Sequence, residues 1–206
     1  EHDAEEIWSA VLSTLHDVCS QLPQAPIAIG ITNQRETLVA WNRASDEALA
    51  PAIVWQDRRT ADRCQQLAAE LPTVRRITGL VLDPYFTGTK AEWLLRNGVI
   101  EPSAHLALGT IDSWILWRLS GGTTFATDES NASRTMLYDI QKHAWSEEMC
   151  SLLSIPMNAL PEVRNSSGIF ATTNVEDIPR GIPISGIAGD QQSALFGQAC
   201  FAAGTA

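Results

Sequence analysis

The chain has 206 residues, of which 45% are hydrophobic and 18% are charged, and its formal net charge is −10. This length and composition are typical of a globular protein with one large domain or two small ones, and they exclude a disordered or fibrous chain. The negative charge argues against nucleic acid and anionic membranes as partners, because both would repel it. The sequence contains neither a long apolar run nor a signal-peptide pattern, so we expect a cytoplasmic protein with no membrane span.

The four cysteines indicate neither a metal site nor a disulfide framework. Cys19, Cys64, Cys150 and Cys200 lie far apart, and the sequence has no CxxC motif and no Cys/His cluster. A zinc site would need such a cluster. Each cysteine lies among apolar residues, so we expect four buried free thiols, which suits a reducing compartment.

The first half of the chain alternates predicted helices and strands. The predicted elements are, in chain order, a helix from Ile7 to Cys19, strands at 27–31, 38–41 and 52–55, and a helix from Arg58 to Leu71. Pro23 and Pro26 end the first helix. The first strand, IAIGI, is apolar at consecutive positions, so we expect it to be buried on both faces.

The second half continues this alternation. Its predicted elements are a helix that begins at Thr89 and ends at Asn97-Gly98, a strand at 105–110, helices at 112–120 and 146–155, a strand at 182–188 and a helix at 190–199. The letters TKAE predict a capping box between Thr89 and Glu92. Alternating strands and helices predict an α/β fold with at least partly parallel strand pairing. Loop 171–183, rich in Pro, Gly and polar residues, is the best candidate for a hinge or domain boundary.

Polar side chains gather where two predicted strands end. TNQRE follows IAIGI, and GDQQ follows ISGIA. In open α/β sheets, ligands bind beyond the carboxyl ends of the strands. Hydrogen-bonding groups and flat aromatic walls together suit a small, neutral molecule with several hydroxyl groups. The candidate hydrogen-bonding residues are Arg35, Glu36, Asp190 and Gln191, and the candidate walls are Trp55, Tyr85 and Phe86.

Each candidate also has a purely structural interpretation. Arg35 and Glu36 could form a surface ion pair with each other, and Asp190 could be the N-cap of the helix that follows it. The three aromatic side chains could belong to the core. The histidines have no serine or cysteine at a meaningful spacing, and the sequence has no GxxxxGK[ST] or GxGxxG phosphate-binding loop.

Seven blocks of the sequence resemble one known family. In chain order they are GITNQRET, IVWQDRRT, TGLVLDPYFTGTK, GTIDSWILWRL, TDESNASRTMLYDI, LPEVRNSS and IPISGIAGDQQSALFGQ. They are similar to the glycerol kinases of the FGGY carbohydrate kinase family, which have an actin-like, ribonuclease-H-like core. The resemblance implies an incomplete α/β domain of this fold, with a parallel or mixed sheet flanked by helices. It implies an N-terminal domain at 1–180, and the first strand and helix of a C-terminal domain at 181–206.

The reaction implied by this resemblance is transfer of the ATP γ-phosphoryl group to a terminal hydroxyl of glycerol, which gives glycerol 3-phosphate. Asp190 matches the general base that accepts the proton of the attacking hydroxyl. Glycerol and Mg-ATP are the implied ligands. The positions that match the family's glycerol-binding residues are Arg35, Glu36, Tyr85, Asp190 and Gln191, with Trp55 as an aromatic wall against the glycerol carbons.

Parts of the family pattern have no counterpart in this sequence. An acidic, Gly-Thr-Thr-type phosphate loop would precede the first helix, and a Gly-rich stretch and an adenosine-binding domain would follow the last. The resemblance therefore assigns no cofactor-binding or metal-binding residue to this chain, and we expect a fragment that cannot catalyse alone. An unpaired sheet edge would recruit another chain, so we expect a homo-oligomer. Region 174–183 is short and acidic, unlike the glycine-rich loop that binds a sugar bisphosphate inhibitor in some bacterial members.

Three other functions stay open from the sequence. The parent protein could phosphorylate another polyol or sugar of the same family. The chain could be a non-catalytic polyol-binding domain that kept the pocket and lost the phosphate machinery. An actin-like ATPase or chaperone ranks last, because it gives no reason for Arg35 and Glu36 at a strand end.

Overall fold

A mixed three-stranded sheet brings together the two strand ends with unusual polarity. A computed structural model describes residues 1–205. The sheet contains β1 (Ile29–Asn33), β9 (Pro183–Gly189) and β8 (Ser167–Thr172), in the order β1-β9-β8. β1 and β9 are parallel, and Asn33 pairs with Gly189 at their carboxyl ends. Residues that follow these two strands therefore emerge at the same edge of the sheet.

The remaining strands form three short pairs. The pairs are β2 (Leu38–Asn42) with β3 (Leu106–Thr110), β4 (Ala126–Asp128) with β7 (Glu162–Arg164), and β5 (Tyr138–Asp139) with β6 (Ala144–Trp145). The helices are α1 (Ala4–Gln21), α2 (Ala61–Gln66), α3 (Leu71–Thr78), α4 (Thr87–Arg96), α5 (Ile111–Leu119), α6 (Glu129–Ala132), α7 (Glu147–Leu152) and α8 (Asp190–Gly197). The predicted α/β class with partly parallel pairing is confirmed.

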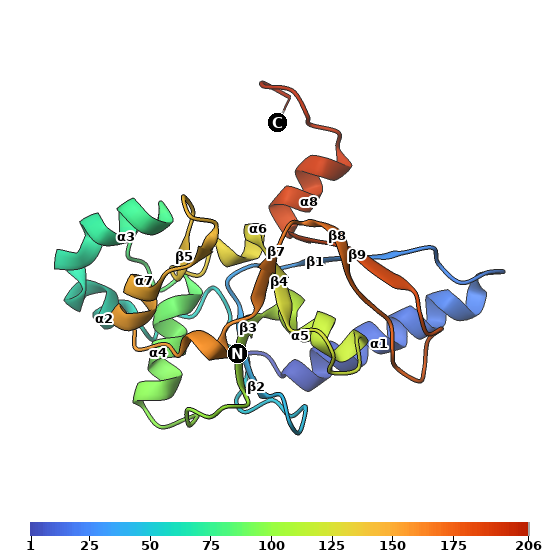
Figure 1. Ribbon diagram of the computed structural model, residues 1–206, viewed down its shortest axis with the longest axis horizontal. Coiled ribbons are helices and arrows are strands. Elements are labelled where there is room, and N and C mark those ends of the chain that lie inside the picture. Colours follow the sequence, from blue (N-terminus) through green and yellow to red (C-terminus); the bar gives the residue numbers. More distant parts are fainter. Residues whose placement is uncertain (206) are drawn as a thin grey trace.

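Helix α1 follows directly from its sequence. Asp3 accepts hydrogen bonds from the backbone amides of Glu5 (2.8 Å) and Glu6 (3.3 Å), which are free at a helix N-terminus. The helix ends at Gln21, two residues before the predicted stop at Pro23. Its apolar face, which includes buried Trp8, packs against the β1-β9-β8 sheet, and α1 runs beside that sheet in Figure 1.

Helix α5 lies inside the molecule. All of its residues except Arg118 are buried, so its apolar side chains surround it instead of forming one stripe. Trp114 contacts Trp41 of β2 edge to face, with ring centres 5.4 Å apart. This helix connects the core beneath the sheet with β2 and β3. At the end of the molecule away from α1 lie four other helices, α2, α3, α4 and α7 (Figure 1).

Two predicted strands differ in the structure. The strand expected at 27–31 begins at Ile29, Ile27 is 95% exposed, and no residue of β1 before Asn33 is fully buried. Among residues 1–205, β1 pairs with β9 alone, so it is an edge strand and not a central one. Residues 52–55 form only isolated bridges, through Ala52 to His2 and Ile53 to Leu38.

Two predicted helices also differ. The helix expected from Arg58 to Leu71 is divided into α2 and a 3₁₀ turn (Ala68–Glu70), and α3 follows from Leu71. The capping box at Thr89 and Glu92 is wrong, because α4 begins at Thr87 and has no side-chain cap. Thr89 is within hydrogen-bond distance of the Thr60 hydroxyl (2.9 Å), and Glu92 accepts two close hydrogen bonds from Arg63, so tertiary contacts use both side chains.

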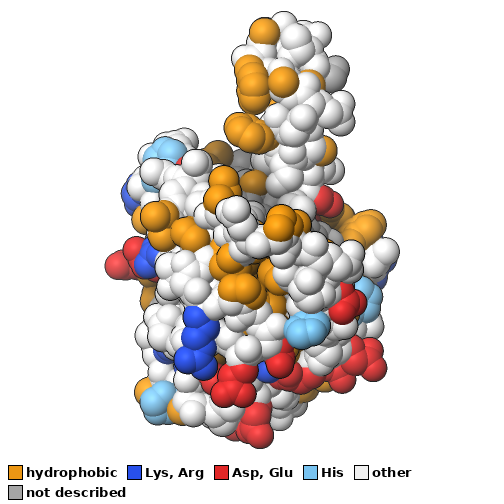
Figure 2. Space-filling view, turned by 90° about the vertical axis from the view of Figure 1, so that its right-hand side faces the viewer, with side chains coloured by type: hydrophobic (Ala, Val, Ile, Leu, Met, Phe, Trp, Pro, Cys, Tyr) orange, Lys and Arg blue, Asp and Glu red, His pale blue; other side chains and the backbone are white. Residues whose placement is uncertain are grey.

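The C-terminal part of the described chain projects from the body of the molecule (Figure 1). Its aromatic side chains are exposed, Phe196 by 74% and Phe201 by 72%, and Figure 2 shows hydrophobic side chains over this projection.

Among residues 1–205, no helix is long and apolar enough to cross a membrane. All four cysteines are free, but only Cys64 and Cys150 are buried, so the expectation of four buried thiols is half correct.

Candidate functional site

Arg35 connects the two strand ends. Its terminal nitrogen donates a hydrogen bond to Oε1 of Gln191 (2.8 Å), and its Nε lies 3.6 Å from Oδ1 of Asp190. The side chain is only 6% exposed, yet its Nε has no hydrogen-bond partner in the described part of the chain. A buried donor without a partner is costly, so a ligand oxygen that reached this nitrogen would satisfy an unmet hydrogen bond.

Gly189 makes this approach possible. A Cβ atom at this position would lie 2.3 Å from Cδ and 2.7 Å from Cγ of Arg35, closer than any side chain tolerates. Gly189 has φ −58°, so its role is space for Arg35 and not an unusual backbone conformation. Its backbone amide donates to the Ser130 hydroxyl (2.8 Å), which fixes the end of β9.

Glu36 is held under backbone strain at the end of β1. Its φ is +64°, in the left-handed region that a non-glycine residue occupies at a cost of about 1–3 kcal/mol. The Thr87 hydroxyl donates to its backbone carbonyl (3.1 Å), and Nε of Arg134 donates to its Oε1 (2.7 Å). The carboxylate is thus buried beside one guanidinium, with a backbone conformation that surrounding contacts maintain.

The predicted aromatic wall lies beside Glu36. Trp55 and Tyr85 have ring centres 5.4 Å apart, and both side chains are partly exposed. Phe86 lies edge-on against Tyr85 and is buried, so of the three aromatic residues it fits the core interpretation best. Buried Lys90 donates to the Tyr85 carbonyl (2.7 Å), and burial lowers the pKa of Lys90 to about 8.

The structure therefore brings Arg35, Asp190 and Gln191 together beyond the carboxyl ends of β1 and β9, and Arg134 joins the neighbouring Glu36 to Tyr85 of the aromatic wall. A surface ion pair between Arg35 and Glu36 is wrong, because both are buried and each pairs with a distant residue. Asp190 is also not the N-cap of α8: Gly189 holds that position, and the Asp190 side chain is 59% exposed. Its carboxylate stands at the positive end of α8, which favours a negative charge.

A buried polar network lies beside this region. Nδ2 of Asn33, at the end of β1, lies within hydrogen-bond distance of Oδ1 of both Asn131 (2.9 Å) and Asp112 (3.3 Å). The hydroxyls of Thr110 and Thr127 also donate to the Asp112 carboxylate. Asp112 is fully buried, and burial raises its pKa to about 6 against the opposing effect of the threonine bonds.

Asp112 makes the stability of the fold depend on pH. Its pKa is higher in the folded chain than the ordinary 3.8, so the folded state binds more protons between pH 4 and pH 6. The contribution of Asp112 to the free energy of unfolding is fully present below about pH 4. It falls by about 3 kcal/mol in total as the pH rises through 6. We expect Asp112→Asn to remove this component. The free energy of unfolding of the variant, relative to that of wild type, should therefore increase by about 3 kcal/mol between pH 4 and pH 7.

The measurement is denaturant unfolding of the 206-residue chain and its variant at both pH values. Asp17→Asn serves as the control, because Asp17 lies on the exposed surface of α1. Equal shifts for the Asp112 and Asp17 variants would contradict this assignment.

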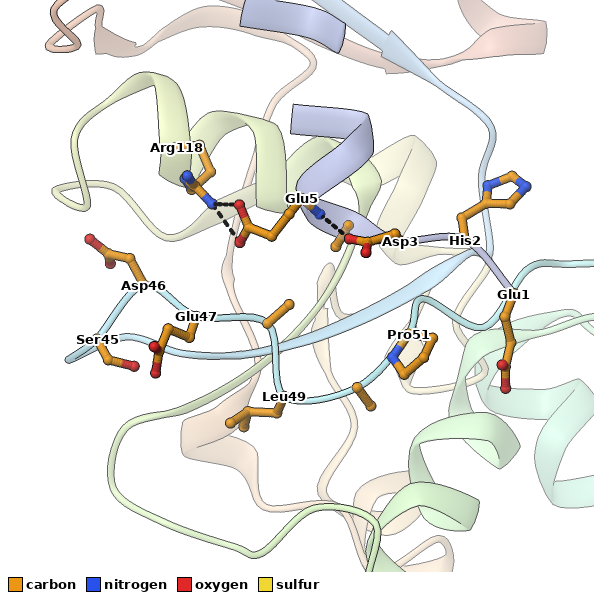
Figure 3. A pocket seen from close by; sticks show the side chains of 13 residues that line it. Glu1, His2, Asp3, Glu5, Ser45, Asp46, Glu47, Leu49, Pro51 and Arg118 are labelled. Carbon is orange, nitrogen blue, oxygen red and sulfur yellow. Dashed lines mark hydrogen bonds and ion pairs between the residues drawn. The ribbon is translucent and has the colours of Figure 1, made fainter. Parts of the chain in front are cut away.

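A separate cavity of about 880 Å³ lies between the N-terminal residues and the 45–51 loop (Figure 3). Its lining is rich in carboxylates, and the one guanidinium there, Arg118, is engaged by Glu5 at 2.7 and 2.8 Å. Such a lining repels anionic ligands. None of the predicted site residues lines this cavity, and it is not part of the candidate site.

Known proteins resemble this chain in both sequence and structure. Residues 1–197 match the model of the FGGY family of carbohydrate kinases, N-terminal domain. The chain belongs to this family. It is 51% identical to a glycerol kinase of Dechloromonas aromatica (strain RCB), over 100% of this chain and 43% of that protein. The predicted ribonuclease-H-like, actin-like fold is confirmed.

Solved structures of family members agree with this assignment. The crystal structure of Plasmodium falciparum glycerol kinase with ADP has a TM-score of 0.92 and 33% identity, covering 98% of this chain and 42% of that one. Xylulose kinase from Lactobacillus acidophilus shares the fold, with a TM-score of 0.85 and 22% identity over 96% of this chain and 41% of its own. The chain thus spans less than half the length of the family members it matches.

Residues 1–205 contain no group of three or more His, Cys, Asp or Glu side chains that could hold a metal ion. The sequence also lacks both glycine-rich phosphate motifs. The polar groups that converge beyond β1 and β9 suit the hydroxyl groups of a small polar molecule.

Three residues of the site were not predicted from the sequence. Arg134 and Ser130 lie within the block TDESNASRTMLYDI, but no local pattern connects them with Glu36 or Gly189, which are 98 and 59 positions away. Gly189 was visible between a strand and a helix, but its close contact with Arg35 depends on the pairing of β1 with β9.

Proposed function

We propose that the protein containing this chain transfers the γ-phosphoryl group of ATP to glycerol and forms glycerol 3-phosphate. The observation that carries this proposal is the convergence of Arg35 with Asp190 and Gln191 beside the buried Glu36 carboxylate. The relatives named glycerol kinase, about 50% identical over the whole chain, support glycerol as the acceptor.

The residues of this chain act on the acceptor side of the reaction. Arg35 donates to a glycerol hydroxyl through its unpartnered Nε, and Glu36 accepts from another through the carboxylate oxygen that Arg134 leaves free. Gln191 adds an amide, and Trp55 and Tyr85 cover the carbon atoms of glycerol. Together these groups hold a small polyol in one orientation, which lowers the entropic cost of the reaction.

Asp190 is the general base of this proposal. Its carboxylate takes the proton of the attacking hydroxyl while the oxygen of that hydroxyl forms a bond to phosphorus. Arg35, 3.6 Å away, keeps Asp190 directed toward the acceptor. When bound, Mg-ATP supplies the phosphoryl group and ADP leaves; nucleotide use is supported by the ADP-containing family member.

Some assignments stay predictions. They are the boundary between a domain at 1–180 and one beginning at 181, a cytoplasmic location, and a homo-oligomer. Within residues 1–205, β1 pairs with β9 alone, and an edge strand offers unpaired backbone groups to another chain, which supports self-association.

The experiment is a coupled ADP-release assay of the full-length protein that contains this chain, with Mg-ATP and a panel of glycerol, xylulose, gluconate and ribitol. We expect kcat/KM for glycerol to exceed that for each larger acceptor by at least about 100-fold, because the larger molecules leave hydrogen-bonding groups unpaired. A preference for any of the other three acceptors would identify a different kinase of the family. No turnover with any of them would favour a non-catalytic polyol-binding protein.

A further inference from the structure

Arg134 occupies the space between the Glu36 carboxylate and the aromatic wall. Its Nε donates to Oε1 of Glu36 at 2.7 Å. The guanidinium carbon lies 4.9 Å from the ring centre of Phe86 and 5.7 Å from that of Tyr85, within the range of cation–π contacts. The side chain is 28% exposed, whereas that of Glu36 is only 2% exposed. Arg134 therefore forms part of the surface that a bound molecule would meet.

This contact determines which oxygen of Glu36 is available. The backbone of Glu36 is fixed by its positive φ and by the Thr87 hydroxyl, so the remaining freedom lies in the side chain. Arg134 engages Oε1, and among residues 1–205 no protein donor bonds Oε2. A planar guanidinium holds a carboxylate in a defined orientation better than a flexible ammonium does. Arg134 thus leaves one Glu36 oxygen, in one direction, for a ligand hydroxyl.

The same short segment also holds the other half of the site. Helix α6 begins after Asp128, whose carboxylate accepts from the backbone amides of Ser130 and Asn131 at 3.0 Å. The Ser130 hydroxyl accepts from the amide of Gly189, immediately before Asp190. Arg134 follows one turn later. One capped turn therefore fixes both the donor to Glu36 and the strand end that carries Asp190.

We propose that Arg134 is a positioning residue that orients the Glu36 carboxylate and thereby sets which acceptor hydroxyls the site recognises. The inference rests on the proposed function, since it assumes that Glu36 binds an acceptor hydroxyl. It predicts that loss of the guanidinium weakens the binding of glycerol by the Glu36 carboxylate, while Asp190 stays in place.

The test uses the full-length protein with Arg134→Met, which keeps an apolar cover over the aromatic rings but removes the donor. Arg134→Lys restores a charge without the planar group. The matched control is Arg76→Met, because Arg76 forms an exposed ion pair with Glu148 at 3.0 Å on α3 and α7. The acceptors are glycerol, propane-1,2-diol and propane-1,3-diol, each diol lacking one glycerol hydroxyl. KM for glycerol, KM for ATP, kcat and the thermal midpoint are measured for each protein.

We expect Arg134→Met to raise KM for glycerol by about 30-fold, which corresponds to the loss of one hydrogen bond to a charged group. KM for ATP should stay within about twofold of the wild-type value. The preference for glycerol over at least one diol should fall by about 10-fold, because a displaced carboxylate no longer requires the missing hydroxyl. Arg134→Lys should return both the KM for glycerol and the acceptor preference part of the way to the wild-type values. Arg76→Met should change neither.

An unchanged glycerol preference in Arg134→Met would overturn the inference. So would equal increases in both KM values together with a lower thermal midpoint, because that result indicates general loss of structure. If wild type does not phosphorylate glycerol, the proposed function fails, and Arg134 is then judged by glycerol affinity in calorimetry. A loss of affinity in Arg134→Met beyond that in Arg76→Met would support the positioning role, and equal affinities would overturn it.

Discussion

Asp190→Asn is expected to lower kcat for glycerol phosphorylation about 1,000-fold, within the range attributed to general acid–base catalysis. Asparagine keeps the size of the side chain and can still lie near Nε of Arg35, but it cannot accept the proton of the attacking hydroxyl. Because Asp190 is exposed and, within residues 1–205, its carboxylate accepts a hydrogen bond only from the adjacent Gln191 amide and lies 3.6 Å from Nε of Arg35, its replacement should leave the fold intact. KM for glycerol should change by less than about 10-fold, since Arg35, Glu36 and Gln191 remain.

The measurement is steady-state kinetics of the full-length protein, with the thermal midpoint as a check on folding. Asp177→Asn is the matched control, because Asp177 is an exposed aspartate in the loop before β9. A kcat for Asp190→Asn within about fivefold of wild type would exclude Asp190 as the general base.

Gly189→Ala should raise KM for glycerol by about 50-fold, the cost of losing a hydrogen bond from a charged donor. The added Cβ would lie 2.3 Å from Cδ of Arg35, in the middle of that side chain, and so the guanidinium must leave its position. Alanine fits the backbone conformation of Gly189, so the change acts through Arg35 and not through strain in β9.

Gly30→Ala offers a close control for this experiment. Gly30 lies on the adjacent strand β1, and the nearest atom to an added Cβ there is the Gly186 carbonyl oxygen at 4.0 Å. Its KM for glycerol should match that of wild type. If both alanine variants behave like wild type, Arg35 does not contribute to acceptor binding from its observed position.

Sequence patterns predicted most of the elements around the site, and tertiary contacts decided the rest. Polar residues directly after apolar runs made Arg35, Glu36, Asp190 and Gln191 candidates, because strand ends are where α/β folds bind ligands. The register that pairs Asn33 with Gly189 is a long-range property that no local pattern contains. For the same reason Arg134, which contacts Glu36 from 98 positions away, could not be recognised by spacing.

The wrong predictions have physical causes of the same kind. The apolar run IAIGI resembles a central strand, but β1 has a strand on one side only within residues 1–205, and Ile27 lies outside it. The letters TKAE fit a capping box, but the Thr89 hydroxyl and the Glu92 carboxylate have tertiary partners in Thr60 and Arg63. In the second case tertiary contacts overrode the local preference.

The account depends on one spatial claim, that groups from two distant parts of the chain surround a single glycerol molecule. The most direct test is a crystal structure of the full-length protein with glycerol bound. We expect Nε of Arg35 and one oxygen of Glu36 each to bond a glycerol hydroxyl, and the Asp190 carboxylate to lie about 2.6–3.2 Å from a terminal hydroxyl. Glycerol bound at another place, or bound here with its terminal hydroxyls out of reach of Asp190, would contradict it.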